Sequence, residues 1–419
     1  MKRKITKFIS VALSVLIVLS SLSIIAFADG TVKRTETLDL NAEGFDVDCS
    51  NEAEGWSWDA DTQTLTLNNV NFDTEGNDAI IIAKKGVTTI IMVGESTIAT
   101  KDDGLAVSRG YFEGAVVFKG DGVLNVEYEG DVGSMDVGSF TLESGTLNIS
   151  GGAVFILNTV IISGGTLNFD TSGCMSNNGQ GFDGFYILNG GAEILGGVVN
   201  IYAERFAFFV VGVGDYDSIN TDKGLVIKGG DVTLCGEMAA SWVGYIDNRE
   251  TVIETTGTVT IKSGRDGIGL YCGKGSIDIR GGIINNPDGL ETEMLFRIPG
   301  GSAKIAKADY SAVDAAISKI PADLSVFTNE SVAAVQEAVN AVDRELNVLD
   351  QRKVNDYAAA IEATVDALEE MTLPQKIAEF FNNLFNADGE TDSECWLVKI
   401  FKAIAGFFAT LYKSFIDIL

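Results

Sequence analysis

The chain contains no histidine in 419 residues. Catalysis by a serine or cysteine nucleophile with a histidine base is therefore excluded, and so is a metal held by imidazole. Cysteine is sparse, with five residues and no Cys-x-x-Cys pair: Cys49, Cys174, Cys235, Cys272 and Cys395. An odd, scattered set of this kind predicts neither a zinc site nor a disulfide framework.

Proline is rarer still, and all four prolines come after residue 286. Because proline cannot donate a backbone hydrogen bond, its absence from the preceding residues favours long, uninterrupted β-ladders. Glycine has the opposite distribution, since only Gly389 and Gly406 of the 47 glycines lie beyond residue 306. The composition therefore places a domain boundary near residue 306.

Positive charge is also scarce, with 30 Lys and Arg against 59 Asp and Glu and a net charge of -29. A field of this sign repels nucleic acid and anionic lipid, so we do not expect nucleic-acid binding. Carboxylates can instead hold calcium or accept hydrogen bonds from sugar hydroxyls.

The first residues are typical of a signal peptide, 1–28. Lys2, Arg3, Lys4 and Lys7 precede an apolar run, and Ala26-Phe27-Ala28 is a small-x-small cleavage site. Export of the chain follows from this interpretation; an uncleaved membrane anchor is the alternative.

Residues 29–306 repeat a short phrase, a glycine followed by alternating apolar and small polar residues. Examples begin at Gly145, Gly165, Gly230, Gly257 and Gly275. Alternation with period two indicates strands, and each unit leaves an apolar face that only a stacked neighbour can bury. The sequence therefore predicts a mainly β protein built on a right-handed parallel β-helix.

A second strand phrase begins with an acidic residue. Its members start at Asp78, Asp103, Asp183, Glu204 and Asp266. Aligned in this way, their third positions are apolar and are expected to point inward: Ile80, Leu105, Phe185, Phe206 and Ile268. Two strand types in each coil, joined by glycine, asparagine and aspartate turns, satisfy the β-helix.

Helical periodicity replaces alternation after the boundary. Residues 307–372 carry apolar spacings of three and four in three segments, which predicts a small three-helix bundle. Residues 373–419 predict an amphipathic helical hairpin, in which Lys399, Lys402 and Lys413 lie on a narrow polar stripe. This tail would contact a membrane interface, or else pack as a hairpin or self-associate.

Two stretches resemble known families. Gly55-Trp-Ser-Trp58, Thr64-Leu-Thr-Leu67 and the Gly-Gly-Thr-Leu-Asn coils resemble β-helical, carbohydrate-binding domain-containing surface proteins of Gram-positive anaerobes. Ala308 to Ile317, with Leu324 to Glu330 and Ala358 to Leu368, resembles the FIVAR module, a three-helix unit of extracellular Gram-positive proteins. The resemblances imply a secreted or cell-surface location and a glycan ligand.

The acidic column is one candidate site: Asp78, Asp103, Asp183, Glu204 and Asp266. Equivalent positions of stacked coils lie about 4.8 Å apart, so such carboxylates would bind calcium, for which Asp183 and Glu204 are the candidates, or hydrogen-bond sugar hydroxyls. A catalytic pair of a polysaccharide lyase or glycoside hydrolase is an alternative, with Arg109, Arg205 and Arg265 nearby. Alternatively, each aspartate caps its own strand start.

Aromatic residues form the other candidate site. Trp56 and Trp58 share one face of a strand and would either stack on pyranose rings or close the end of the solenoid core. Tyr186, Tyr245 and Tyr271 form an exposed strip or internal stacks, whereas the alignment places Trp242 inside. No catalytic residue is assigned, and no cofactor is expected other than calcium. The sequence favours a non-catalytic surface for carbohydrate binding or adhesion, with an enzyme and a protein-binding stalk as alternatives.

Overall fold

The computed structural model describes residues 32–83, 86–109, 114–131, 133–174, 181–212, 223–246 and 248–386, together with Ile404, Gly406 and Phe407. The expected signal peptide, 1–28, and most of the tail lie outside these residues. The chain divides into two units, Met1–Asp309 with Glu345–Arg352, and Tyr310–Arg344 with Lys353–Leu419.

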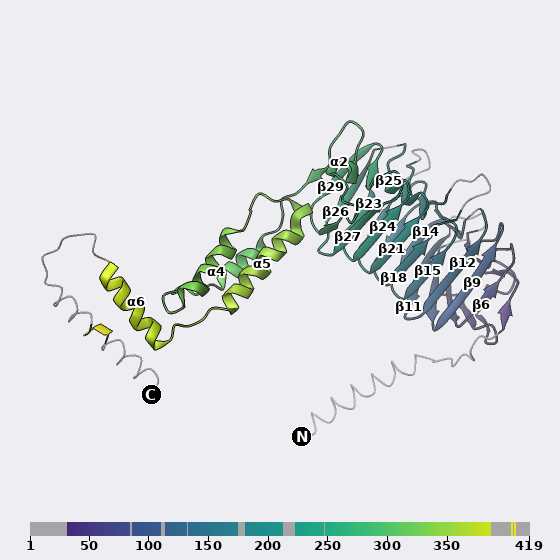
Figure 1. Ribbon diagram of the computed structural model, residues 1–419. Helices are drawn as coiled ribbons and strands as arrows, with labels where there is room; N and C mark the ends of the chain where they lie inside the picture. The colour runs from purple at the N-terminus through teal and green to yellow at the C-terminus, as the bar shows by residue number, and fades with distance from the viewer. Residues whose placement is uncertain are drawn as a thin grey trace, which may run out of the picture. The chain divides into compact units, whose positions relative to one another are not determined.

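The first unit is a stack of strands in three long sheets (Figure 1). Sheet A contains, in spatial order, β1 (Lys33–Arg34), β6 (Asn71–Asp73), β9 (Glu95–Lys101), β12 (Val123–Glu129), β15 (Thr146–Ser150), β18 (Thr166–Asp170), β21 (Val198–Ala203), β24 (Asp231–Gly236), β27 (Thr258–Ser263) and β30 (Ile283–Asn285). Sheet B contains β2 (Leu38–Asp39), β7 (Ile80–Ile81), β10 (Val107–Ser108), β13 (Met135–Val137), β16 (Val154–Ile156), β19 (Phe185–Ile187), β22 (Phe206–Val210), β25 (Ala239–Val243), β28 (Leu270–Cys272) and β31 (Phe296–Arg297). Sheet C contains β3 (Cys49–Asn51), β4 (Trp56–Asp59), β5 (Thr64–Asn68), β8 (Val87–Val93), β11 (Ala115–Gly120), β14 (Ser139–Leu142), β17 (Val160–Ile162), β20 (Ala192–Ile194), β23 (Lys223–Ile227), β26 (Arg249–Ile253), β29 (Gly275–Ile279) and β32 (Lys304–Ile305).

Successive strands pass to sheets A, B and C in turn, and strands of neighbouring coils pair in parallel. The chain is thus a parallel β-solenoid, as predicted, but each coil has three strands and not two. Four of the quoted glycine phrases lead into sheet A, whereas Gly275 opens β29 in sheet C. Several other strands of sheet C also follow a glycine, as β8, β11 and β14 follow Gly86, Gly114 and Gly138, so the glycine phrase does not distinguish sheet A from sheet C.

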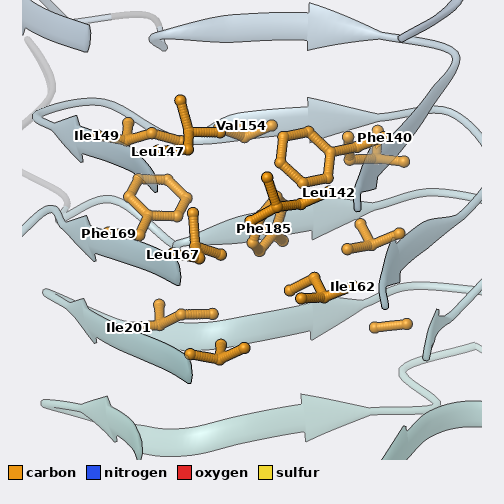
Figure 2. Close-up of a cluster of buried hydrophobic side chains, with 14 of the residues drawn as sticks. Phe140, Leu142, Leu147, Ile149, Val154, Ile162, Leu167, Phe169, Phe185 and Ile201 are labelled. Carbon is orange, nitrogen blue, oxygen red and sulfur yellow. The ribbon is translucent and has the colours of Figure 1, made fainter. Parts of the chain in front are cut away.

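The core fills the space between the three sheets. Alternate residues of each strand are buried, as in β9, where Ser96, Ile98 and Thr100 face inward. Figure 2 shows one stretch of this core, with side chains from all three sheets converging. The ring of Phe185 lies 5.2 Å from that of Phe140 and 5.3 Å from that of Phe169.

The turns into sheet A require glycine for two reasons. Gly165, just before β18, has a φ of +73°, a backbone conformation that residues with a Cβ rarely adopt. A Cβ on this residue would also lie 2.6 Å from the carbonyl oxygen of Gly145, the equivalent turn one coil earlier. Stacked turns at this spacing leave no room for a side chain.

Both ends of the solenoid core are covered. At the first coils, Trp56 and Trp58 are buried in an antiparallel hairpin of β3, β4 and β5. At the last coils, a short α-helix, α2 (Thr292–Leu295), precedes β31, and the 3-10 helix η1 (Val348–Asp350) places Val348 in the solenoid core.

The second unit contains α3 (Ser311–Ser318), α4 (Asn329–Asn340) and α5 (Gln351–Asp366), the last of which begins in the first unit. Their buried side chains recur at helical spacing: Val313, Ala316, Val335, Val354, Ala358 and Ile361. Lys319 pairs with Glu362 at 2.6 Å, and the Thr328 hydroxyl caps α4 by accepting from the Ser331 N–H. Three α-helices thus lie within residues 307–372, and their assignment as a FIVAR-like bundle stays a prediction.

The tail begins with α6 (Leu373–Asn386). The Phe380 ring lies 6.1 Å from that of Phe407, a contact that a packed hairpin would make. No helix in the described part of the chain is long and apolar enough to cross a membrane.

Candidate functional site

An uninterrupted row of aromatic side chains follows the outer face of sheet B. We call it the aromatic ladder, and its members are Phe155, Tyr186, Phe209, Trp242 and Tyr271. Each is paired in register with the next across one coil, so the row extends about 19 Å along the solenoid. The residues between them along each strand, such as Phe185, Phe208 and Leu270, face the core.

The rings of the ladder contact one another, Tyr186 on Phe209 and Trp242 on Tyr271 edge to face and the other two pairs in a tilted arrangement. Successive centroids lie 5.6, 5.2, 5.7 and 4.8 Å apart, within the range of favourable aromatic pairs. Phe209 is almost covered, and the other four rings are half-buried. Tyr245, 52% exposed, leans on both Phe209 and Trp242.

A second layer supports the ladder near Phe209. Phe206 is buried and lies 5.4 Å from Phe209 and 5.3 Å from Trp242. The Arg205 guanidinium sits 5.3 Å from the Phe206 ring and 5.9 Å from the Phe209 ring, where cation–π attraction holds it. This small cluster is separate from the solenoid core.

The expected inward column is therefore corrected at Phe206, Ile268 and Trp242, which join the outer cluster. Period-two alternation fails at the start of β22, where Ala207 and Phe208 both enter the core. The same break recurs in β25, where Ala240 is in the core and the next residue, Ser241, is also fully buried and paired with Phe208. Leu105 is only half-buried, whereas Ile80 and Phe185 face inward as expected.

Asp183 is the buried charge of the site. It is 4% exposed, its Oδ2 lies 3.7 Å from Arg205 Nη1, and its Oδ1 has no hydrogen-bond partner among the described residues. Burial raises the pKa of this carboxyl to about 7, although Arg205 and the Phe206 backbone N–H oppose the shift. Burial also raises the pKa of the Tyr186 hydroxyl, and the charge of Asp183 acts in the same direction.

Trp242 carries a second buried polar atom without a described partner, its indole Nε1. Buried polar groups are normally hydrogen-bonded, and unsatisfied ones are costly.

The charged residues at the two ends of the ladder differ. Asp136 is paired in register with Phe155 and accepts a hydrogen bond of 2.7 Å from Arg109 Nε. Arg297 is paired with Tyr271 at the other end and is exposed.

The five acidic residues do not form a column. The structure pairs Ile80 with Val107 and Phe185 with Phe208. Asp78 and Asp183 precede Ile80 and Phe185 by two residues. Asp103, Glu204 and Asp266 precede the residues in the same register, Val107, Phe208 and Leu270, by four. Asp78 and Asp183, which share a register, are four coils apart, or about 19 Å.

Each carboxylate instead has a local role or an exposed position. Asp78 Oδ1 accepts from the Leu105 N–H at 3.0 Å, and Glu204 Oε2 accepts from the Gly173 N–H at 2.9 Å. Asp103 and Asp266 are exposed, and Asp266 lies 3.6 Å from Arg265. Within the described residues, no three Asp, Glu or Cys side chains gather as a metal site requires. The turn and ion-pair interpretations therefore fit these residues better than a calcium site at Asp183 and Glu204.

The paired tryptophans do not form an exposed platform. The Trp56 Nε1 donates to Glu54 at 2.7 Å, and the Trp58 Nε1 donates to the Phe45 carbonyl at 2.9 Å. The Trp56 ring stacks on Phe45 at 5.9 Å. Their place is in the core at the first coils, which was the alternative left open by the sequence.

Comparison of the chain with protein-family models, with curated proteins and with solved structures gives no match. The side chains on the surface of the solenoid are therefore the basis for a proposed function.

Proposed function

We propose that this chain is a secreted, cell-surface protein that binds glycans without altering them, and that the aromatic ladder is its binding surface. The proposal is carried by one observation, the row of five aromatic side chains on the solvent side of sheet B. The row is partly exposed, and contiguous apolar surface is characteristic of interaction sites.

The chemistry of the ladder suits a sugar polymer. Aromatic faces pack against the C–H groups of pyranose rings, and the exposed Tyr245 adds a hydroxyl beside them. Arg205 and Arg297 supply hydrogen-bond donors near the middle and at one end. An extended chain along the solenoid axis would meet one aromatic ring in each coil.

The remaining parts of the chain take supporting roles in this proposal. The solenoid, which we predict to be right-handed, presents the surface, and the FIVAR-like helices act as a spacer. The tail, 373–419, holds the protein at a membrane interface or joins it to another copy.

The enzyme alternative has lost its specific support, because the carboxylates on which it depended lie in different registers. If the chain is instead a protein-binding stalk, a protein and not a glycan would cover the ladder. Identifying the ligand of the ladder therefore distinguishes the two hypotheses.

The test is affinity electrophoresis of the purified protein through gels containing plant, host or bacterial polysaccharides. We expect at least one polymer to retard the protein, and we expect Trp242→Ala and Tyr271→Ala each to weaken binding by about 2- to 10-fold, the value of one aromatic contact.

Tyr357→Ala is the matched control, since it removes an aromatic ring from α5 in the helical unit. It should leave the retardation unchanged. Retardation by none of the polymers, or equal retardation of the two ladder variants and the wild type, would refute the proposal and favour a protein partner.

A further inference from the structure

Sheet A carries an open groove of about 540 Å³ on its outer face. Its floor is a row of asparagines in register, which we call the asparagine groove: Asn125, Asn148, Asn168 and Asn200. A second outward row, two residues further along each strand, lines one side: Glu127, Ser150, Asp170 and Tyr202. Sheet A is a different face of the solenoid from the one that carries the aromatic ladder.

The asparagine side chains are joined by hydrogen bonds along the solenoid axis. Each Nδ2 donates to the Oδ1 of the preceding coil, at 2.7 Å to Asn125, 2.9 Å to Asn148 and 3.0 Å to Asn168. The Asn125 Nδ2 continues the row by donating to Glu95 at 3.2 Å. The amides are therefore held in one orientation before any ligand arrives.

An amide has two N–H donors and two acceptor lone pairs, and the row uses one of each. One N–H and one lone pair remain at each internal rung for a ligand in the groove. The rungs repeat about every 4.8 Å, close to the rise of one sugar in an extended β-1,4-linked glycan. A hydroxyl group, which both donates and accepts, complements each rung.

The walls of the groove select against negative charge. Glu127 and Asp170 are exposed on either side of Ser150, and the whole chain has a net charge of -29. At the far end, Tyr202 offers an aromatic ring with Lys262 Nζ 5.6 Å from its centroid. Uronic acid polymers would meet repulsion here, whereas uncharged sugars would not.

We infer that the asparagine groove is a second binding site, for an uncharged, extended, linear polysaccharide, recognised by hydrogen bonds rather than by stacking. With the aromatic ladder on another face, one solenoid can hold two chains at once. Two weak sites on one rigid body would then bind a polymer network more strongly than either site alone.

The test uses isothermal titration calorimetry of the full protein carrying Trp242→Ala and Tyr271→Ala, so that binding at the ladder is weakened. The probes are the neutral β-1,4-linked hexasaccharides of glucose, mannose and xylose, and the β-1,4-linked hexasaccharide of mannuronate as the acidic counterpart. We expect at least one neutral probe to bind and the mannuronate probe not to bind.

Two groove variants then locate the site. Ser150→Arg places a long side chain between Glu127 and Asp170 while leaving the asparagine row intact, and it should weaken the neutral probe more than about tenfold. Asn168→Leu removes one rung and should also weaken it. Thr141→Arg makes the same change as Ser150→Arg on the outer face of sheet C and should have no effect.

The inference is overturned if no neutral hexasaccharide binds, if the mannuronate hexasaccharide binds equally well, or if Ser150→Arg binds as tightly as its parent. The groove variants separate these outcomes from a failure of the aromatic ladder, because neither of them changes a ladder residue.

Discussion

Asp183 shows how one buried residue couples the candidate site to pH. Its pKa is about 7 in the folded protein, whereas an aspartate in the unfolded chain titrates near 3.8. Between these values the unfolded state binds fewer protons than the folded state. The stability of the protein therefore falls as the pH rises from about 4 to about 7 on account of this residue, and levels off above.

Asp183→Asn should remove this pH dependence, because the amide resembles the protonated acid at every pH. We expect the stability advantage of the variant over the wild type to be larger at pH 8 than at pH 5 by roughly 1–3 kcal/mol, because only the wild type loses stability between these pH values. Thermal unfolding followed by circular dichroism at both pH values measures the difference.

Asp266→Asn is the control, since it makes the same change at an exposed carboxylate of the same strand phrase. The effect of Asp266→Asn on the unfolding temperature should be small at both pH 5 and pH 8. If Asp183→Asn shifts the unfolding temperature equally at pH 5 and pH 8, the buried carboxyl is not the source of the dependence.

The turns between sheets C and A show what the element requires of the sequence. Gly165 combines a φ of +73° with a neighbouring carbonyl oxygen 2.6 Å from where a Cβ would stand. Gly165→Ala should lower the free energy of unfolding by more than about 2 kcal/mol, from backbone strain and from the clash together.

Gly267→Ala separates the destabilisation that backbone strain causes from the destabilisation that the clash causes. Gly267 also has a positive φ, +64°, but nothing lies within 4 Å of an added Cβ. Gly267→Ala should therefore lower the free energy of unfolding by only about 1 kcal/mol, as expected for backbone strain alone. Chemical unfolding of both variants provides the comparison, and equal losses would show that the stacked turns have room for a side chain.

Elements also show how far the sequence can be interpreted. Alternation after Gly145 and Gly165 located strands of sheet A, because each phrase carries its own turn and its own apolar face. Strands of sheet C such as β14, which follows Gly138, carry the same alternation, so the pattern alone did not assign the strands to three sheets. The right-handed winding stays a prediction.

The candidate site was predicted only in part, for a related reason. Tyr186 and Tyr271 lie on the outer face, where a strip of aromatics was one of two expectations. Trp242 was placed inside, because the break of alternation at Ala240 depends on packing and leaves no pattern in the sequence. The acidic residues were misaligned because register is decided by which strands stack, here Ile80 on Val107.

At the scale of the whole molecule, a solenoid has two open core ends, and each needs a cover. The hairpin with Trp56 and Trp58 covers the first coils, and it belongs to the solenoid by sequence. The cover at the last coils comes from far along the chain. Val348 follows α3 and α4 in sequence, yet it is 2% exposed within the solenoid core.

This arrangement makes the last coils dependent on η1. In a stack where each coil contacts only its neighbours, loss of an end cover frays the nearest coils first and leaves distant ones protected. Val348→Ala should therefore accelerate amide hydrogen exchange in β27 to β32 and leave β9 to β15 unchanged. Its cost in the free energy of unfolding should be about 1–3 kcal/mol.

Val326→Ala is the matched control, because Val326 lies in the helical unit and is 37% exposed. Exchange in the solenoid should not respond to it. Uniform acceleration along the solenoid in Val348→Ala would mean that the coils unfold as one cooperative body, in which case the ladder and the groove would share one stability. Local acceleration would mean that the asparagine groove, built on β12 to β21, is insulated from events at the end where the helices join the solenoid.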